Sequence, residues 1–161
     1  MSELSSKGYQ VLARKYRPST FSDLIGQDVM VKILEKSFLS ERIAHAFMLT
    51  GVRGVGKTTT ARLIAKALNC QKNLDKTISC SIEKFCPTCE EIINSNHIDI
   101  LEMDAASKTG IDDIRELIEN SKYSPTSAKY KIFIIDEVHM LSKQAFNGLL
   151  KTLEEPPPSL K

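Results

Sequence analysis

The sequence predicts an α/β domain of three layers, in which helices cover both faces of a parallel sheet. Segments of strand length alternate with segments of helical periodicity along the chain, as is typical of such folds. The segment 131–135 is apolar at every position after its first lysine, as expected of a parallel strand buried on both faces. A glycine-rich turn at 51–58 lies between a predicted strand and a predicted helix.

The composition is that of one globular domain of 161 residues, 42% of them hydrophobic and 26% charged. The formal net charge of +2 gives no charge excess that would indicate nucleic-acid binding. The sequence has no run of about 18 apolar residues that could span a membrane, and it begins without an apolar signal segment. We therefore expect a cytoplasmic protein with no membrane partner, in which four cysteines do not form disulfides.

Residues 1–45 are expected to form a lead-in and the first helix of the domain. The basic segment 14–18 ends in a proline, and its composition is more typical of a solvated turn than of a contact site. Asp28 is expected to cap a helix that continues to about Ser40. The apolar side of this helix would carry Met30, Ile33, Leu34 and Phe38.

Residues 46–161 are expected to form the core, which begins with a buried strand at 46–50, a turn at 51–58 and a helix at 59–68. The turn fits the phosphate-loop pattern G-x-x-x-x-G-K-[ST], in which glycines let backbone N–H groups approach a triphosphate. Lys57 would place its charge at the β and γ phosphates of ATP, and Thr58 would offer a hydroxyl to Mg²⁺. The predicted ATP-binding residues are Gly51, Val52, Arg53, Gly54, Val55, Gly56, Lys57, Thr58 and Thr59. The alternative is a glycine-rich surface turn, which the strand and helix on either side make less favourable.

Two further strands are predicted, and each ends in acidic residues. The strand 98–103 ends at Asp104, and the strand 131–135 ends at Asp136 and Glu137. A helix should follow Gly110, with its apolar stripe formed by Ile111, Ile114, Leu117 and Ile118. Another helix should begin at a Ser142 cap and end at the prolines 156–158, with Phe146, Leu149, Leu150 and Leu153 at helical spacing.

Asp136 and Glu137, about 80 residues after the glycine loop, fit a Walker B strand. Asp136 would orient Mg²⁺, and Glu137 would polarise the attacking water for ATP hydrolysis. An ordinary acidic turn is the alternative, and it is the weaker one because the phosphate-loop pattern precedes it. The predicted catalytic residues are therefore Lys57, Asp136 and Glu137. The three histidines, at 45, 97 and 139, are more typical of structural positions.

The cysteines Cys70, Cys80, Cys86 and Cys89 fall at 69–90, where the alternation of strands and helices is interrupted. Cys86-Pro87-Thr88-Cys89 is a C-x-x-C knuckle, which is typical of half a tetrahedral zinc site. Four thiolates would leave no open position on Zn²⁺, so the predicted site is structural. Unlinked thiols, or a redox pair at Cys86 and Cys89, remain the alternatives.

These segments together resemble the N-terminal part of the gamma/tau subunits of bacterial DNA polymerase III, which are AAA+ clamp-loader ATPases. The resemblance covers most of residues 13–157. It rests on the segments 13–18, 21, 25–27, 51–60, 67–70, 102–107, 135–142 and 147–157. The phosphate loop is common to many ATPases, whereas the cysteine insertion and the strings 102–107 and 136–157 are far more discriminating.

The resemblance implies that the chain binds ATP, Mg²⁺ and Zn²⁺, with Thr58 and Asp136 serving magnesium and the four cysteines serving zinc. It also implies that 14–18 and 25–27 line the adenine side. The implied partners are other clamp-loader subunits, the sliding clamp, primed DNA and the polymerase core. DNA synthesis itself would belong to a partner subunit of the holoenzyme, which is a nucleotidyltransferase.

Two departures from the family pattern qualify these expectations. Five residues separate Cys80 from Cys86, whereas the family usually has two at this point of its zinc module. The chain also stops at Lys161, before the strand that would lie between the phosphate-loop strand and the Walker B strand. We therefore expect an incomplete AAA+ core that alone is poorly stable and nearly inactive.

Three other classes of protein share parts of the pattern. A different AAA+ motor, such as a branch-migration helicase, would have no need of the cysteine insertion. A non-enzymatic zinc module that binds nucleic acid would predict salt-sensitive DNA binding, although the insertion carries as many acidic as basic residues. A P-loop kinase is less favoured, because the acidic pair at 136–137 suits water as the acceptor.

Overall fold

The computed structural model describes residues 12–72, 80, 85–107 and 110–161. Within this part of the chain no helix is long and apolar enough to cross a membrane. The elements in chain order are α1 (Leu12–Lys15), the 3-10 helix η1 (Phe21–Asp23), α2 (Asp28–Leu39), α3 (Lys57–Asn69), α4 (Pro87–Ile93), β1 (Ile100–Asp104), α5 (Ile111–Ser121), β2 (Ile132–Asp136), the 3-10 helix η3 (Val138–Met140) and α6 (Lys143–Glu154).

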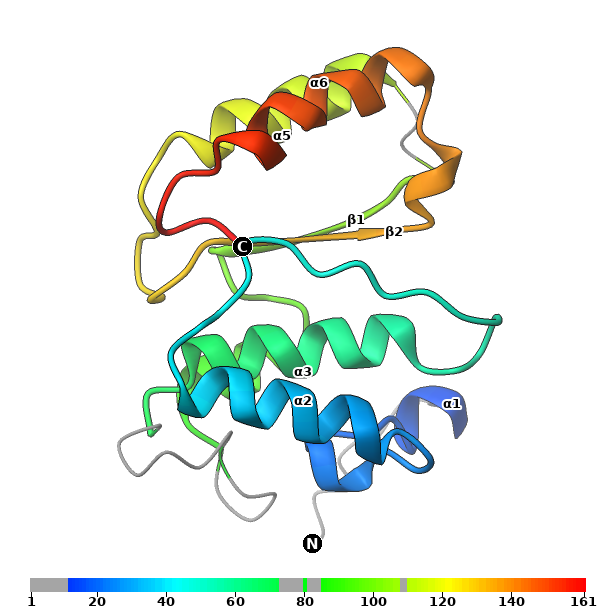
Figure 1. Ribbon diagram of the computed structural model, residues 1–161, viewed down its shortest axis with the longest axis vertical. Helices are drawn as coiled ribbons and strands as arrows, with labels where there is room; N and C mark the ends of the chain where they lie inside the picture. The colour runs from blue at the N-terminus through cyan, green and yellow to red at the C-terminus, as the bar shows by residue number, and fades with distance from the viewer. Residues whose placement is uncertain (1–11, 73–79, 81–84, 108–109) are drawn as a thin grey trace, which may run out of the picture.

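The strands β1 and β2 form a parallel sheet in which Ile100 lies opposite Ile132 and Asp104 opposite Asp136. The helices α5 and α6 cover one face of this sheet, and α2 and α3 lie on the other (Figure 1). Each face has its own buried cluster, one built mainly on α3 and the other on α5 and α6. The predicted α/β class with a parallel sheet is therefore confirmed, and the helices lie on both of its faces.

Residues 159–161 extend the sheet beside the start of β2. The N–H of Lys131 donates to the carbonyl of Ser159 at 2.8 Å, and the N–H of Phe133 donates to that of Lys161 at 3.0 Å. Lys131 and Leu160 form a parallel bridge, so this segment runs in the same direction as β2.

The strand predicted at 46–50 is wrong in this structure: the segment is extended but belongs to no sheet. A strand needs a neighbouring strand that pairs with its backbone N–H and C=O groups. On the side of β2 that faces away from β1, the backbone of β2 pairs instead with residues 159–161. Just before the predicted strand, His45 Nδ1 lies 3.5 Å from Lys161 Nζ. Phe47 packs against the core, whereas the Met48 side chain is 80% exposed.

The helix predictions hold for position but not for every detail. Ser142 caps α6 as predicted, since its hydroxyl accepts from the N–H of Ala145 at 3.2 Å. The N-cap of α2 is Gln27 rather than Asp28, which is the first residue of the helix. Ile33 was expected on the apolar side of α2, but its side chain is 63% exposed.

The helix α3 is tied to β2 by polar contacts at both of its ends. At its start, the hydroxyl of Thr58 contacts both carboxylate oxygens of Asp136, at 3.0 and 2.9 Å. At its end, the side-chain amide of Asn69 donates to the carbonyl of Tyr130 at 3.0 Å and accepts from its N–H at 2.8 Å. These contacts fix both the direction of α3 and its position along β2.

Asp99 holds the approach to β2 in place from the residue before β1. Its carboxylate accepts from the backbone N–H groups of Thr126, Ser127 and Ala128 at 2.7, 2.8 and 2.9 Å, and the residue is only 1% exposed. Burial alone would raise the pKa of Asp99, but these hydrogen bonds lower it below its ordinary value.

We expect D99N to lower the free energy of unfolding by about 2 kcal/mol at neutral pH, because a carboxylate accepts these N–H groups more strongly than an amide. A lowered folded-state pKa stabilises the protein above the unfolded-state pKa of about 3.9, and this contribution is lost as pH falls through the lower folded-state pKa. The difference between the two proteins should therefore shrink in acid. Urea unfolding across pH measures it. D112N is the control, because Asp112 pairs with Arg115 on the surface, where little stability is expected. Equal stability of D99N and wild type at pH 7 would contradict the prediction.

Candidate functional site

The glycine loop, residues 51–58, has a backbone path that needs its glycines. Gly54 and Gly56 have φ of +84° and +95°, a region that L side chains rarely adopt. A Cβ on Gly51 would lie 3.2 Å from a methyl group of Val55. The chain therefore passes close to itself here, and a side chain on Gly51 would crowd Val55.

The glycine loop leads directly into the N-terminus of α3, with Gly56 as the N-cap. The first backbone bond of the helix runs from the N–H of Thr60 to the carbonyl of Gly56 at 2.8 Å. The N–H groups before it have no acceptor within the helix, and they carry the positive end of the helix dipole. A loop followed by such a helix end suits a bound phosphate.

Lys57 extends back over the glycine loop. Its ammonium donates to the carbonyls of Gly51 and Val52 at 3.0 and 3.1 Å. The side chain of Val52 is exposed, as is that of Arg53. The charge of Lys57 therefore lies beside the backbone groups that a phosphate would meet.

The contact between Thr58 and Asp136 brings the two predicted halves of the site together across 78 positions of the chain. A hydroxyl and a carboxylate are oxygen ligands of the kind that Mg²⁺ binds. Asp104 lies opposite Asp136 in the sheet, and its carboxylate accepts from the N–H of Ala106 at 2.8 Å. The carboxyl ends of both strands thus place acidic groups at one edge of the sheet.

Glu137 follows β2 with a left-handed backbone, φ +50°. This conformation is uncommon for a residue other than glycine, and it directs the chain from β2 into η3. The carboxylate is about half exposed and lies 3.6 Å from Nδ1 of His139. Glu137 is therefore open to water and adjacent to the Thr58–Asp136 contact in the chain.

Sequence reasoning did not identify Arg62, which lies one turn after Thr58 on α3. Its guanidinium bonds a carboxylate oxygen of Glu102 at 2.8 Å through both Nε and Nη2. These two residues, with Asp104 and Asp136, line an open hollow of about 630 Å³ at the edge of the sheet. Its spacing of four residues from Thr58 could have identified it, because residues one helical turn apart lie on the same face of a helix.

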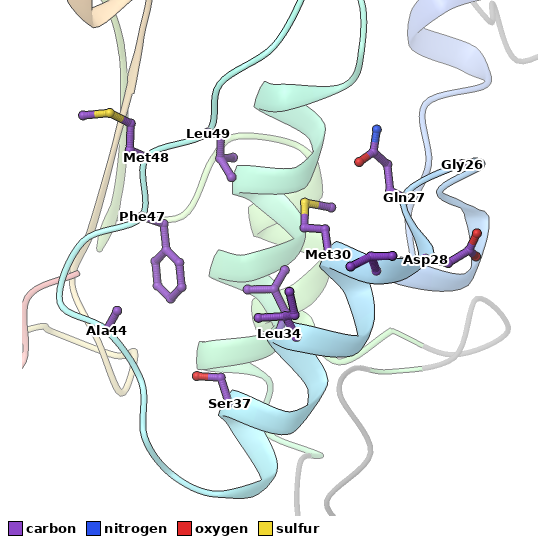
Figure 2. Close-up of a pocket in the computed structure, with 12 residues that line it drawn as sticks. Gly26, Gln27, Asp28, Met30, Leu34, Ser37, Ala44, Phe47, Met48 and Leu49 are labelled. Atoms are coloured by element: carbon purple, nitrogen blue, oxygen red, sulfur yellow. The ribbon is translucent and has the colours of Figure 1, made fainter.

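A second hollow, of about 640 Å³, lies between α2 and the extended segment 44–49. Figure 2 shows its mostly apolar lining, with Met30 and Leu34 on one side and Phe47 and Leu49 on the other. Gly26 and Gln27 are among the residues that line it, whereas Ile25 is 96% exposed and does not line it. No residue of the glycine loop is among its lining residues.

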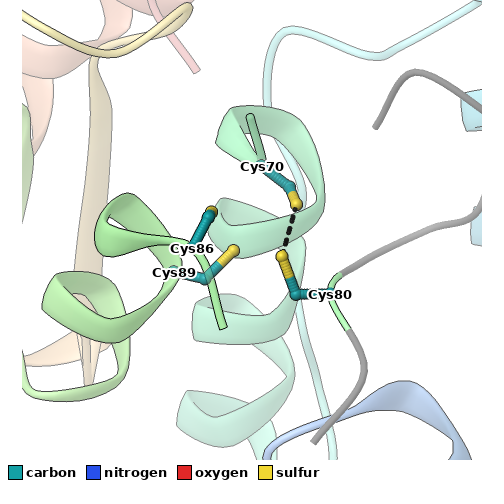
Figure 3. Close-up of side chains that lie close together, drawn as sticks. All are labelled: Cys70, Cys80, Cys86 and Cys89. Atoms are coloured by element: carbon teal, nitrogen blue, oxygen red, sulfur yellow. Dashed lines mark hydrogen bonds between the residues drawn. The ribbon is translucent and has the colours of Figure 1, made fainter. Parts of the chain in front are cut away.

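The four cysteines come together at the far end of α3 (Figure 3). Cys70 follows the last residue of α3, Cys86 is the N-cap of α4, and Cys89 lies in the first turn of α4. Pro87 at the first helical position favours this start, so the C-x-x-C knuckle is held by a helix end. All four thiols are buried and unbridged, and their sulfur atoms lie within 4.8 Å of one another.

This arrangement fits a tetrahedral metal ion. Zn–S bonds of about 2.3 Å place sulfur atoms roughly 3.8 Å apart, within the spread observed here. Cys80 joins the cluster despite the longer spacing, and its sulfur lies 3.2 Å from that of Cys70. The remainder of the predicted module, 73–79 and 81–84, falls outside the described residues.

The thiols differ in acidity. Burial raises the pKa of Cys80 and of Cys89 above the ordinary value. Burial acts on Cys86 as well, but hydrogen bonds from the backbone of Cys89 and Gln71 lower its pKa to about 7. One member of the cluster is therefore readily ionised at neutral pH, as metal ligation by thiolate requires.

Comparison with known proteins adds to this geometry. The family model described as DNA polymerase III, delta subunit, matches residues 26–160. The chain is 48% identical over 153 residues to DNA polymerase III subunit tau of Escherichia coli (strain K12), a match that covers 95% of this chain and 23% of that protein. It is 49% identical over 153 residues to subunit gamma of Buchnera aphidicola subsp. Schizaphis graminum (strain Sg), which covers 95% of this chain and 41% of that protein.

A relative with lower identity also matches most of this chain and a minor part of its own length. The chain is 45% identical over 150 residues to DNA polymerase III subunit tau of Bacillus subtilis (strain 168), which covers 92% of this chain and 26% of that protein. The chain therefore spans less than half the length of the curated relatives that it matches here.

Proposed function

The chain belongs to the DNA polymerase III delta-subunit family, and we propose that it is the ATP-binding unit of a clamp-loader ATPase in DNA replication. The observation that carries the proposal is the contact between Thr58 and Asp136. It places a loop suited to phosphate beside the acidic end of a strand, and this is the pairing that ATP with Mg²⁺ requires.

The residues of the glycine loop and the acidic pair that ends β2 have separate roles in this proposal. The backbone of 51–56 and the first turn of α3, with Thr59, bind the phosphates. Lys57 turns from its own loop carbonyls to the β and γ phosphates, and Thr58 and Asp136 hold Mg²⁺. Glu137 polarises the water that attacks the γ phosphate. The contacts and the exposure of these side chains support this assignment.

The proposed metal of the cysteine cluster is structural zinc, which would also supply the ionic cross-link that a buried group of four thiolates needs. The cluster separates the leading proposal from the alternative of a branch-migration helicase, which gives no reason for four cysteines to meet. A zinc module that binds nucleic acid without hydrolysing ATP is less supported, because it gives no reason for a phosphate-type loop to lie beside the acidic end of β2.

The relatives are named as tau and gamma subunits of DNA polymerase III, and the whole assembly is part of the proposal. The unit would act with other clamp-loader subunits on the sliding clamp and primed DNA, in contact with the polymerase core. Residues 1–45 would be the lead-in with the first helix, and residues 46–161 would belong to the ATPase core. The place of action would be the cytoplasm.

The magnesium assignment can be tested by binding. We expect T58A to weaken Mg²⁺-dependent ATP binding at least tenfold, because one oxygen ligand is lost, while binding in EDTA changes little. Titration calorimetry of the full chain with ATP, with and without Mg²⁺, measures both. T152A on α6 is the matched control. An unchanged affinity in Mg²⁺ would contradict the role of Thr58.

The role of Glu137 predicts a separation of binding from hydrolysis. We expect E137Q to lower the hydrolysis rate by about 100-fold or more in the assembled complex, while ATP affinity stays near that of wild type. Single-turnover hydrolysis of labelled ATP gives the rate. Hydrolysis by E137Q at the wild-type rate would exclude Glu137 as the residue that activates water.

The zinc assignment can be tested by metal content. We expect about one zinc ion per chain by mass spectrometry, lost in C80S, because three thiolates do not complete the tetrahedral site. T88S lies between two cysteines in the same knuckle and should keep the metal. A folded wild-type protein that contains no zinc after purification with zinc present would overturn the assignment.

A further inference from the structure

Lys66 is a buried lysine that neither proposed site uses. It lies on α3 one turn before Cys70, and its exposed fraction is 0%. Residues four positions apart in a helix share a face, so Lys66 and Cys70 lie on the same side of α3. A buried ammonium is costly unless hydrogen bonds and opposite charge compensate it.

The direct partners of Lys66 carry no charge. Its ammonium donates to the carbonyl of Ser19 at 2.6 Å and lies 4.1 Å from the centre of the Phe85 ring. Among the described residues, none of the ion pairs includes Lys66. A carbonyl and an aromatic face orient a cation, but neither neutralises it.

Two sources of negative charge act on Lys66, namely the cysteine cluster and the carboxylate of Asp23. Phe85, whose ring lies beside the ammonium, packs against the cluster of four cysteines and directly precedes Cys86. Burial lowers the pKa of Lys66, whereas negative charge on Cys89, Cys80 and Cys70, and on Asp23, would raise it. Negative charge on the sulfur atoms would therefore stabilise the charged form of Lys66.

Four thiolates around one dication leave two negative charges in a buried place. We propose that Lys66 is the counter-cation of this metal–thiolate cluster, and that it fastens the segment 19–23 to the cluster. The inference rests on the zinc part of the proposed function, and it adds a positioning residue outside the four ligands. Residues around metal ligands commonly tune metal affinity in this way.

The second half of the inference follows from Ser19. Its N–H donates to Asp23 Oδ2 at 3.2 Å, and the N–H of Thr20 donates to the same oxygen at 2.9 Å. The carbonyl that Lys66 holds therefore belongs to the turn that begins η1. Zinc binding should order this turn through Lys66, although no zinc ligand lies in it.

The test compares zinc affinity in full chains that carry single substitutions. K66Q keeps a donor for the Ser19 carbonyl but removes the charge, and we expect its zinc affinity to be 10- to 100-fold weaker in competition with a chelator. K66R keeps the charge and should stay closer to wild type than K66Q. Equal losses in K66Q and K66R, or a K66Q affinity within twofold of wild type, would overturn the role of the charge.

K131Q is the matched control, because Lys131 is also buried and also donates to one carbonyl, that of Asn120, at 2.8 Å. Its affinity for zinc should be unchanged, even if its stability falls. A wild-type chain that binds no zinc would overturn the zinc assignment and this inference together. A wild-type chain that binds zinc with K66Q unaffected would overturn this inference alone.

Hydrogen exchange supplies a readout that does not need K66Q to fold. Zinc added to the wild-type apo protein should slow exchange of the N–H groups at 19–23 by at least tenfold, and F85L, which removes the ring under the ammonium, should reduce this slowing. Exchange at 19–23 that is equal with and without zinc would overturn the coupling.

Discussion

The attachment of α3 to β2 at both ends is the constraint on which both candidate sites depend. Thr58 contacts Asp136 where β2 ends, and Asn69 bonds both backbone groups of Tyr130 just before β2 begins. A helix held only by apolar packing can slide, because dispersion and burial have little direction. Hydrogen bonds at two separate points remove that freedom. The glycine loop and Cys70 are consequently fixed at opposite ends of one rigid element.

The register of the sheet determines where the acidic side chains of the candidate site lie. Asp104 and Asp136 are opposite each other, so the acidic ends of both strands lie at one edge. Because parallel strands deliver all their carboxyl ends to the same edge, a loop that packs there meets several carboxylates at once. Asp99 and the backbone groups of 126–128 act on the opposite edge, where they hold the approach to β2. One edge of the sheet therefore carries the acidic groups of the candidate site, and the opposite edge carries hydrogen bonds that stabilise the fold.

The sequence allowed prediction wherever a local pattern determines structure. Ser142 caps α6 because its hydroxyl reaches the N–H of Ala145, whereas the similar pattern at Asp28 missed the N-cap of α2 by one residue. The glycine loop and the pair Cys86 and Cys89 were predictable from their spacing, whereas Cys80 joins the cluster although its spacing departs from the family pattern. The segment 46–50 was not predictable, because whether an apolar run becomes a strand depends on a neighbour far away in the chain. Lys66 and Asn69 gave no signal, since a lysine and an asparagine within a helix usually face solvent.

A metal at the cysteine end of α3 would influence the glycine loop by holding the helix in place rather than by its charge. The helix has 13 residues, so roughly 20 Å separate the glycine loop from the cysteines. Electrostatic influence over that distance is weak in salt solution. The last turn of a helix is where fraying begins, and the sequence that follows Cys70 has few apolar residues. Cross-linking Cys70 to α4 would prevent this fraying, and would keep Asn69 bonded to Tyr130. The geometry at Thr58 would then depend on a metal that never meets the nucleotide.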